Sequence, residues 1–256
     1  MPVISTEQAE AFFLIFIRVT AVMITIPVLG DASVPMRVKA GLSLMMAMIL
    51  FPVMQTYVSN SSFDIFSLVL RMIGEVLIGM AIGFGSRLIF AGIQLAGQLI
   101  GFQMGLSIAN VIDPANNTQV SVISQFQYLV ALLIFLLMDG HHIFIYAIAD
   151  SIRVLPPLNF HFSGPLLEVL INMMGKMFIV AIKVGAPIVA ILFFLSIGMG
   201  LVARTVPQIN IFVVGFPLQI AVGLIGIGVT IPLFIKIVET CFVDMKTEIG
   251  MLLNAM

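Results

Sequence analysis

The chain has 256 residues, of which 61% are hydrophobic and 9% are charged, and its mean hydropathy is +1.21. An ordinary soluble domain carries about 25% charged residues, so this composition excludes a typical soluble enzyme, a disordered chain and a secreted disulfide scaffold. The net charge of −1 creates no field that attracts nucleic acid, and the single cysteine, Cys241, excludes an intrachain disulfide.

Long apolar runs separated by sparse polar residues predict membrane helices, because a helix needs about 20 apolar residues to cross a bilayer. In the first half of the chain these runs are Ala11–Leu29, Ala40–Val58, Ile65–Ser86 and Leu88–Ile112. A fifth run is interrupted, with parts at Tyr128–Met138 and Ile143–Ala149. The second half has runs at Leu166–Val202 and Ile209–Ile235, followed by the amphipathic tail Lys236–Met256. This pattern predicts six or seven membrane segments.

The runs are continuous and lack the two-residue alternation of barrel strands, so we expect an all-α integral membrane protein. The run Leu166–Val202 is too long for one simple crossing. We therefore expect long kinked helices, with Pro187 as the kink in this run.

Basic residues give the orientation only in part. Arg37 and Lys39 place the first connecting loop in the cytoplasm by the positive-inside rule. Arg204 is the only basic residue in its loop, so the orientation of the C-terminal half stays open.

Small residues recur at intervals of four in two of the runs. Such spacing lets helix backbones approach closely, and a glutamine amide in lipid needs a partner. The face lies either against other helices of the chain, which we favour, or against another subunit or a pore. Its predicted members are Gly79, Gly83, Gln94, Gly97, Gln98, Gly101 and Gly105.

Charges inside apolar runs form a second group of candidates. Arg71 and Glu75 are four residues apart and can pair along one helix, while Arg18 and Lys183 also lie deep in their runs. Each should face protein or water, because a charge at mid-bilayer costs about 2.5–3.5 kcal/mol. Structural pairing is favoured over a proton relay, which needs more aligned carboxylates than Glu75 alone.

The interruption Asp139-Gly140-His141-His142 contains possible metal ligands. Adjacent histidines are expected to point apart on a helix, and the third histidine, His161, is twenty residues further on. We therefore favour a polar helix break that lines a wet crevice or an interface, and expect no metal and no cofactor.

Two polar segments connect apolar runs. The segment from Asp113 to Gln119 has the composition of a water-facing loop, and the tip of a helical hairpin is predicted at Arg204, Pro207, Gln208 and Asn210. No catalytic motif such as HExxH, GxSxG or a P-loop is present in the sequence, so we do not expect an enzyme.

An ordered set of motifs over nearly the whole chain resembles the FliR family, the flagellar biosynthetic protein of the type III export gate. The motifs, in chain order, are Glu75, Gly79 and Gly83; Gln94 and Gly97; Gln103-Met104-Gly105-Leu106-Ser107; Asp113-Pro114; Gly140-His141; Ser151 and Pro156; Gly185 and Pro187; Arg204, Pro207, Gln208, Asn210 and Phe212; Gly215-Phe216-Pro217; and Gly223-Leu224.

The resemblance implies a non-enzymatic subunit of the gate in the bacterial inner membrane, within the flagellar basal body. Its implied partners are FliP-type and FliQ-type subunits, other export-apparatus proteins, membrane lipid and unfolded flagellar substrates, with no nucleic acid. Residues 1–165 look FliP-like, with the plug loop, and residues 166–256 look like a FliQ-type helical hairpin and tail. The hairpin tip at Arg204–Asn210 is then cytoplasmic, and hydropathy overcounts the bilayer crossings.

The resemblance also implies a loop that plugs the closed pore. By position it maps onto Asn110, Val111, Ile112, Asp113, Pro114, Asn116, Asn117 and Gln119. The alternatives are a homologous subunit of a virulence injectisome, an ion-coupled secondary transporter, or an intramembrane enzyme with Asp139, His141 and His142 as its only candidate residues.

Overall fold

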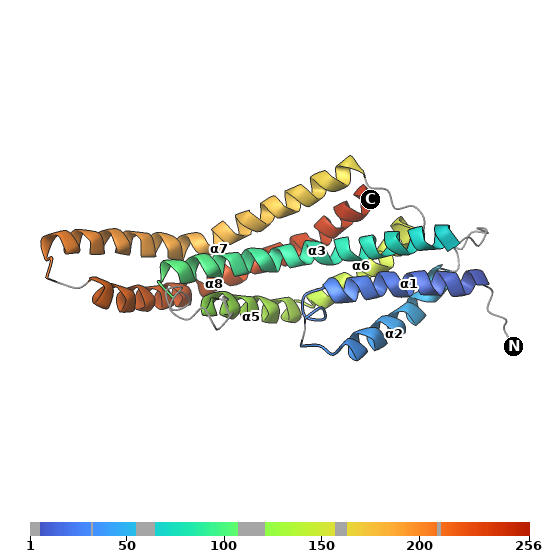
Figure 1. Cartoon of the computed structure of the whole chain (residues 1–256), viewed down its shortest axis with the longest axis horizontal. Helices are drawn as coiled ribbons and strands as arrows, with labels where there is room; N and C mark the ends of the chain where they lie inside the picture. The colour runs from blue at the N-terminus through green and yellow to red at the C-terminus, as the bar shows by residue number, and fades with distance from the viewer. Residues whose placement is uncertain (1–5, 32, 55–64, 107–120, 157–162, 209–210) are drawn as a thin grey trace. The chain divides into compact units, whose positions relative to one another are not determined.

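The computed structural model describes residues 6–31, 33–54, 65–106, 121–156, 163–208 and 211–256, and these residues form helices joined by turns, with no strand among them (Figure 1). The helices are α1 (Thr6–Thr25), α2 (Met36–Met54), α3 (Ile65–Gln103), α5 (Val122–Leu137), α6 (Gly140–Val154), α7 (Gly164–Thr205) and α8 (Ile211–Ala255). The prediction of an all-α chain of long helices is confirmed.

Four helices of the described chain are long and apolar enough to cross a membrane: α1, α3, α7 and α8. The number is five if the interrupted pair α5 and α6 forms one broken span. The chain is thus an integral membrane protein, and its described residues contain four or five candidate membrane spans, against the six or seven predicted for the whole sequence.

Two of the predicted runs are parts of one helix, because a charged residue was treated as a helix end. Arg87 does not interrupt α3, which runs without a break from Ile65 to Gln103, and α8 includes the whole predicted tail to Ala255. Helix continuity depends on backbone hydrogen bonds, and an arginine is a good helix former. Helix α7 likewise continues through Pro187.

The chain forms two compact units, each assembled from separate stretches of sequence. Unit 1 comprises residues 1–88, 139–174 and 243–256, and unit 2 comprises residues 89–138 and 175–242. Helices α3, α7 and α8 contribute to both units.

Unit 1 is organised around α1, which packs against α2 and α6 (Figure 1). One face of α1 is almost fully buried, and its innermost residues are Leu14, Ile15, Val19 and Val22. The rings of Phe12 on α1 and Phe51 on α2 meet edge to face, with centroids 5.8 Å apart. The start of α7 is joined to the end of α8 by Ser163, whose hydroxyl caps the Leu166 N–H and donates to the carbonyl of Ala255.

Unit 2 has an aliphatic and an aromatic cluster in its core. The aliphatic cluster joins α3, α5, α7 and α8 through Ile100, Met104, Ile123, Ile188, Leu192 and Ile227. The aromatic cluster contains Phe90, Tyr128, Phe135 and Phe242, with ring centroids 5.2–5.9 Å apart in the contacting pairs. Both clusters bring side chains from distant parts of the sequence together.

Candidate functional site

The most deeply buried charged group of unit 1 is the guanidinium of Arg18 on α1. It is 0% exposed, and it forms a two-pronged ion pair with Glu75 on α3, which is 1% exposed. It also donates to the Ser151 hydroxyl at 3.3 Å and to the carbonyl oxygen of Leu155 at 2.9 Å. One side chain thus connects α1, α3 and α6.

The bond from Arg18 to Leu155 places a cation at the C-terminal end of α6, since Leu155 is the cap residue of that helix. Helix C-termini present carbonyl groups without intrahelical partners and favour positive charge. Four hydrogen bonds satisfy the guanidinium inside the protein, and such satisfaction is the condition under which a buried charge is tolerated.

The predicted pairing of Arg71 with Glu75 along α3 is wrong. Arg71 instead donates to Glu10 on α1 at 2.6 Å, while Glu75 pairs with Arg18. These two charges of α3 therefore bind to opposite charges on α1, and the pair between Arg18 and Glu75 is two-pronged. The arrangement supports structural pairing over a proton relay.

Arg87 has a structural role that the sequence did not predict. From α3 it donates to the carbonyl oxygens of Thr25 at 2.7 Å and Ile24 at 3.1 Å, and so caps the C-terminus of α1. A lone arginine between two apolar runs was the available signal, and it was interpreted as a boundary.

Gly79 and Gly83 form the contact between α3 and α1. A methyl group added at Gly79 would lie 2.6 Å from Cβ of Ala21 and 2.8 Å from the carbonyl oxygen of Arg18, and one added at Gly83 would collide with the side chain of Thr25. The favoured interpretation, packing within the chain, agrees with these contacts. Gly79 lies against Ala21, and Gly83 lies against Thr25. The residue numbers of these contacts rise together along the two helices, so α1 and the first part of α3 run parallel.

Gly97 and Gly101 make the corresponding contact in unit 2. An added methyl group at Gly97 would collide with the backbone of Ser124, and one at Gly101 would collide with the hydroxyl of Ser121. The Ser124 hydroxyl donates to the carbonyl oxygen of Gln94 at 2.9 Å, which fixes the start of α5 on α3. The side chain of Gln98, in contrast, is exposed.

Gly105 does not belong to this helical stripe, contrary to the prediction. Helix α3 ends at Gln103, and Gly105 has φ of +79°, the left-handed conformation that glycine adopts without strain. The Gly105 N–H donates to the carbonyl of Phe102 and the Leu106 N–H to that of Gly101, the pair of bonds that defines a Schellman end. A side chain at Gly105 would also collide with the ring of Phe216 on α8, since Cβ would lie 2.6 Å from it.

The predicted plug residues, from Asn110 to Gln119, lie outside the described residues. The residues on either side of the segment 107–120 are described, and both contact the same turn of α3. Leu106 bonds to the carbonyl of Gly101, and the hydroxyl of Ser121 lies against the Cα of Gly101. The two ends of the segment are therefore held close together. Ser121 Oγ and Gln127 Oε1 are buried with no hydrogen-bond partner among the described residues.

The predicted hairpin tip falls between α7 and α8. Arg204 lies in the last turn of α7, Pro207 and Gln208 are exposed in the following turn, and Asn210 lies outside the described residues. The structure thus shows a connection between two long helices at this position.

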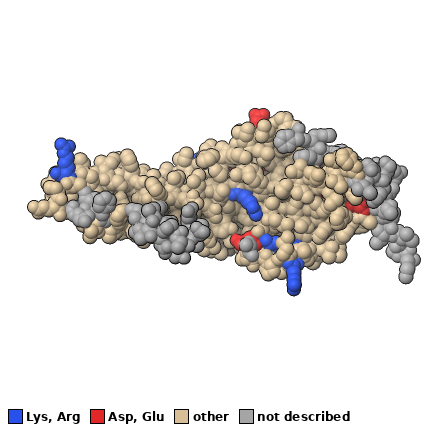
Figure 2. Space-filling model, in the orientation of Figure 1, with Lys and Arg blue, Asp and Glu red and all other residues tan. Residues whose placement is uncertain are grey.

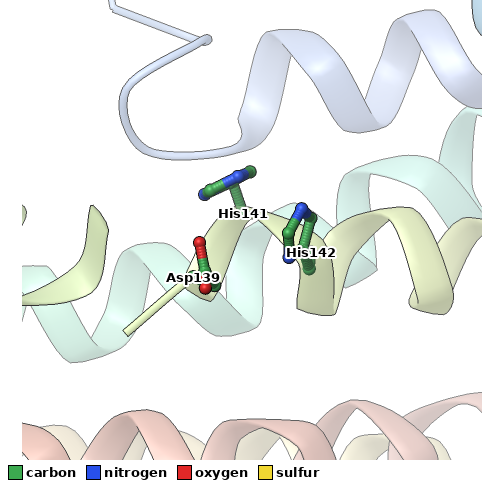
Figure 3. Close-up of side chains that lie close together, drawn as sticks. All are labelled: Asp139, His141 and His142. Atoms are coloured by element: carbon green, nitrogen blue, oxygen red, sulfur yellow. The ribbon is translucent and has the colours of Figure 1, made fainter. Parts of the chain in front are cut away.

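The break between α5 and α6 brings three candidate metal ligands together. The ligand atoms of Asp139, His141 and His142 all lie within 4.8 Å of one another, and the three residues are exposed (Figure 3). The expectation that the two histidines point apart is wrong, because their ring centroids are only 4.3 Å apart. His161 lies outside the described residues.

Most of the described surface on the face shown in Figure 2 is uncharged, with few Lys, Arg, Asp and Glu side chains, and many large apolar side chains of the described residues are exposed. On α7 alone, Phe178, Phe193 and Phe194 are exposed by 55–70%. Lys183 is also exposed, near the middle of this apolar helix. Its charge is costly in hydrocarbon, so this face of α7 requires protein or water beside Lys183.

Comparisons with known proteins identify the family of the chain. The family model described as "Bacterial export proteins, family 1" matches residues 9–245. The flagellar biosynthetic protein FliR of Bacillus subtilis (strain 168) is 37% identical over 236 residues, which cover 91% of this chain and 90% of the relative. The FliR proteins of Escherichia coli (strain K12) and Pectobacterium carotovorum subsp. carotovorum are 35% and 34% identical, each over 90% of this chain and 88% of the relative.

These matches and the all-α membrane architecture define the class of the protein. The chain belongs to the family of bacterial export proteins that includes the flagellar biosynthetic FliR proteins.

The buried ion pair generates a test of stability. Replacing Glu75 with leucine leaves the Arg18 charge buried without its partner, and we expect a loss of about 3–5 kcal/mol in the free energy of unfolding. The double variant Arg18→Met, Glu75→Leu removes both charges and should recover most of this loss. Thermal unfolding of the full chain in detergent measures both effects. Glu168→Gln, at an exposed position of unit 1, is the matched control and should unfold like the parent.

The close approach at Gly101 generates a second test. Gly101→Val should destabilise the chain itself by about 1–3 kcal/mol, because the side chain enters the packed contact with Ser121. Gly198→Val, in α7 where an added methyl group meets nothing within 4 Å, is the control and should leave the unfolding midpoint nearly unchanged. Equal midpoints for the two variants would contradict the packing at Gly101.

Proposed function

We propose that the chain is a non-enzymatic subunit of the flagellar type III protein export gate in the bacterial inner membrane. The proposal rests first on the family match over residues 9–245 and on relatives that are named flagellar biosynthetic proteins. These names favour the flagellar system over a virulence injectisome. No specific feature of the described residues favours an ion-coupled transporter.

The observation that carries the need for partner subunits is the length of the apolar helices. At about 1.5 Å per residue, the 42 residues of α7 span about 63 Å, twice the hydrocarbon thickness of about 30 Å. To lie wholly in the hydrocarbon, such a helix would have to tilt by about 60°, whereas tilts reach only about 40°. Helix α8, with 45 residues, poses the same problem.

Apolar side chains are exposed at both ends of α7, from Leu167 and Ile171 to Leu201 and Val202. Lipid covers only part of this length, so the rest requires apolar protein surface. FliP-type and FliQ-type subunits, implied by the family resemblance, are the proposed source of that surface. Residues 1–165 would take the FliP-like place and residues 166–256 the FliQ-like place in the assembly.

The predicted loop from Asn110 to Gln119, within the segment 107–120, is the proposed plug of the pore. Supporting the proposal are its polar composition and the anchoring of both its neighbours, Leu106 and Ser121, on the turn of α3 that contains Gly101. A segment held at both ends can change conformation while the flanking helices stay packed. Unfolded flagellar proteins would pass when the plug moves.

Purification from native membranes tests the partner proposal. The affinity-tagged chain should bring down two smaller membrane proteins, and Phe194→Glu should reduce their recovery at least several-fold, because Phe194 is 70% exposed on α7. Phe194→Leu keeps the surface apolar and is the matched control. Recovery of the unmodified chain as a solitary, stable monomer would overturn the proposal.

Ion conductance tests the plug. Deleting Asn116 to Gln119 should raise the ion leak through the assembled complex in planar bilayers, because the shortened segment no longer fills the pore. A glycine–serine replacement of the same four residues separates the effect of length from that of sequence. Conductance equal to that of the parent complex after the deletion would refute the plug assignment.

A further inference from the structure

The first turn of α6 carries a cluster of side chains that the proposed export function does not use. Asp139, His141 and His142 each offer one ligand atom, and these atoms lie within 4.8 Å of one another. All three side chains are exposed, and Figure 3 shows them projecting from one turn of the chain. The cluster lies entirely within unit 1.

The backbone at Asp139 is specialised for this arrangement. Asp139 occupies the N-cap position of α6 in a left-handed conformation, with φ of 54° and ψ of 31°. An aspartate at this position normally accepts a hydrogen bond from the first turn of the helix, but the Asp139 carboxylate makes no such bond. Its carbonyl oxygen instead accepts the N–H of His142 at 2.9 Å. The carboxylate is thereby left beside the imidazole rings (Figure 3).

We propose that Asp139, His141 and His142 bind a divalent transition-metal ion of the borderline class, such as Zn²⁺. Two imidazoles and one carboxylate suit this class, whereas Mg²⁺ and Ca²⁺ require sets of oxygen ligands. Tetrahedral coordination with bonds of about 2.0–2.1 Å places ligand atoms about 3.3 Å apart. The side chains therefore close by about 1.5 Å on binding, which rotamer changes of exposed groups allow.

The site would supply three ligands and leave the remaining position to water or to a group from a partner. An ion held there ties Asp139 to the first turn of α6. The ion would therefore fix the left-handed conformation of Asp139, which directly follows Met138, the C-terminal cap of α5. The proposed role is structural, and it holds the helix break in one conformation.

Titration with the metal alone tests the site. The full chain, purified in detergent with an affinity tag free of histidine, is titrated with Zn²⁺ by calorimetry and by competition with a chromophoric indicator. We expect one Zn²⁺ per chain, with affinity about tenfold or more weaker in His142→Gln and in Asp139→Asn. Mg²⁺ should not compete.

His161→Gln is the matched control, since it removes the remaining histidine of the chain and should leave the affinity unchanged. Circular dichroism and gel filtration verify that each variant is folded. Co²⁺ added to the unmodified chain gives a second readout, a visible d–d spectrum of imidazole-bound metal that zinc displaces. Absence of stoichiometric binding, affinity equal to that of the parent in the triple variant Asp139→Asn, His141→Gln, His142→Gln, or loss of binding in His161→Gln would each overturn the site. These readouts do not depend on export.

Discussion

The buried guanidinium of Arg18 determines how unit 1 is assembled. A charge at 0% exposure is tolerated only when it is paired and hydrogen-bonded, and the partners of Arg18 come from two other helices: Glu75 on α3, and Ser151 and Leu155 at the end of α6. Apolar packing alone permits one apolar helix to pack against another in many rotational orientations. A two-pronged ion pair combined with a capped helix end permits only one such orientation. The contacts of Arg18 therefore specify how α1, α3 and α6 align.

Small residues make the same contact possible. Gly79 lies one helical turn beyond Glu75, and its missing side chain lets the backbone of α1 approach to the distance that the ion pair requires. Gly97 and Gly101 repeat the device where α5 begins, and there it holds the chain on both sides of the proposed plug segment. The close approaches and the polar contacts are therefore parts of one packing solution, in which glycine sets the spacing and hydrogen bonds set the register.

Local pattern in the sequence was sufficient for the helical class, but insufficient for the ends of the helices and for their packing partners. Continuous apolar runs predicted an all-α membrane protein, and that class is confirmed. Arg87 was taken as a boundary because hydropathy registers its charge, whereas its bonds to the carbonyls of Thr25 and Ile24 depend on a helix more than sixty residues away. Arg71 was expected to pair with Glu75 because the two residues are four apart on one helix, whereas their actual partners lie on α1. Gly105 continued a four-residue spacing, yet the same spacing also fits the glycine that ends a helix, and only the backbone conformation distinguishes the two.

The described chain has polar contacts inside and apolar side chains outside, the reverse of a soluble protein. This distribution indicates which kind of surroundings the chain needs. Its strongest polar contacts are internal, between Arg18 and Glu75 and between Arg71 and Glu10, while large apolar side chains cover the outside. Lipid stabilises such a surface over about 30 Å, but α7 and α8 are each about twice that long. The excess length carries exposed leucine, isoleucine and phenylalanine, and exposed Lys183 lies near the middle of α7. A surface that is too long for lipid and yet contains a charge within its apolar stretch is the physical basis of the proposal that other protein subunits surround the chain.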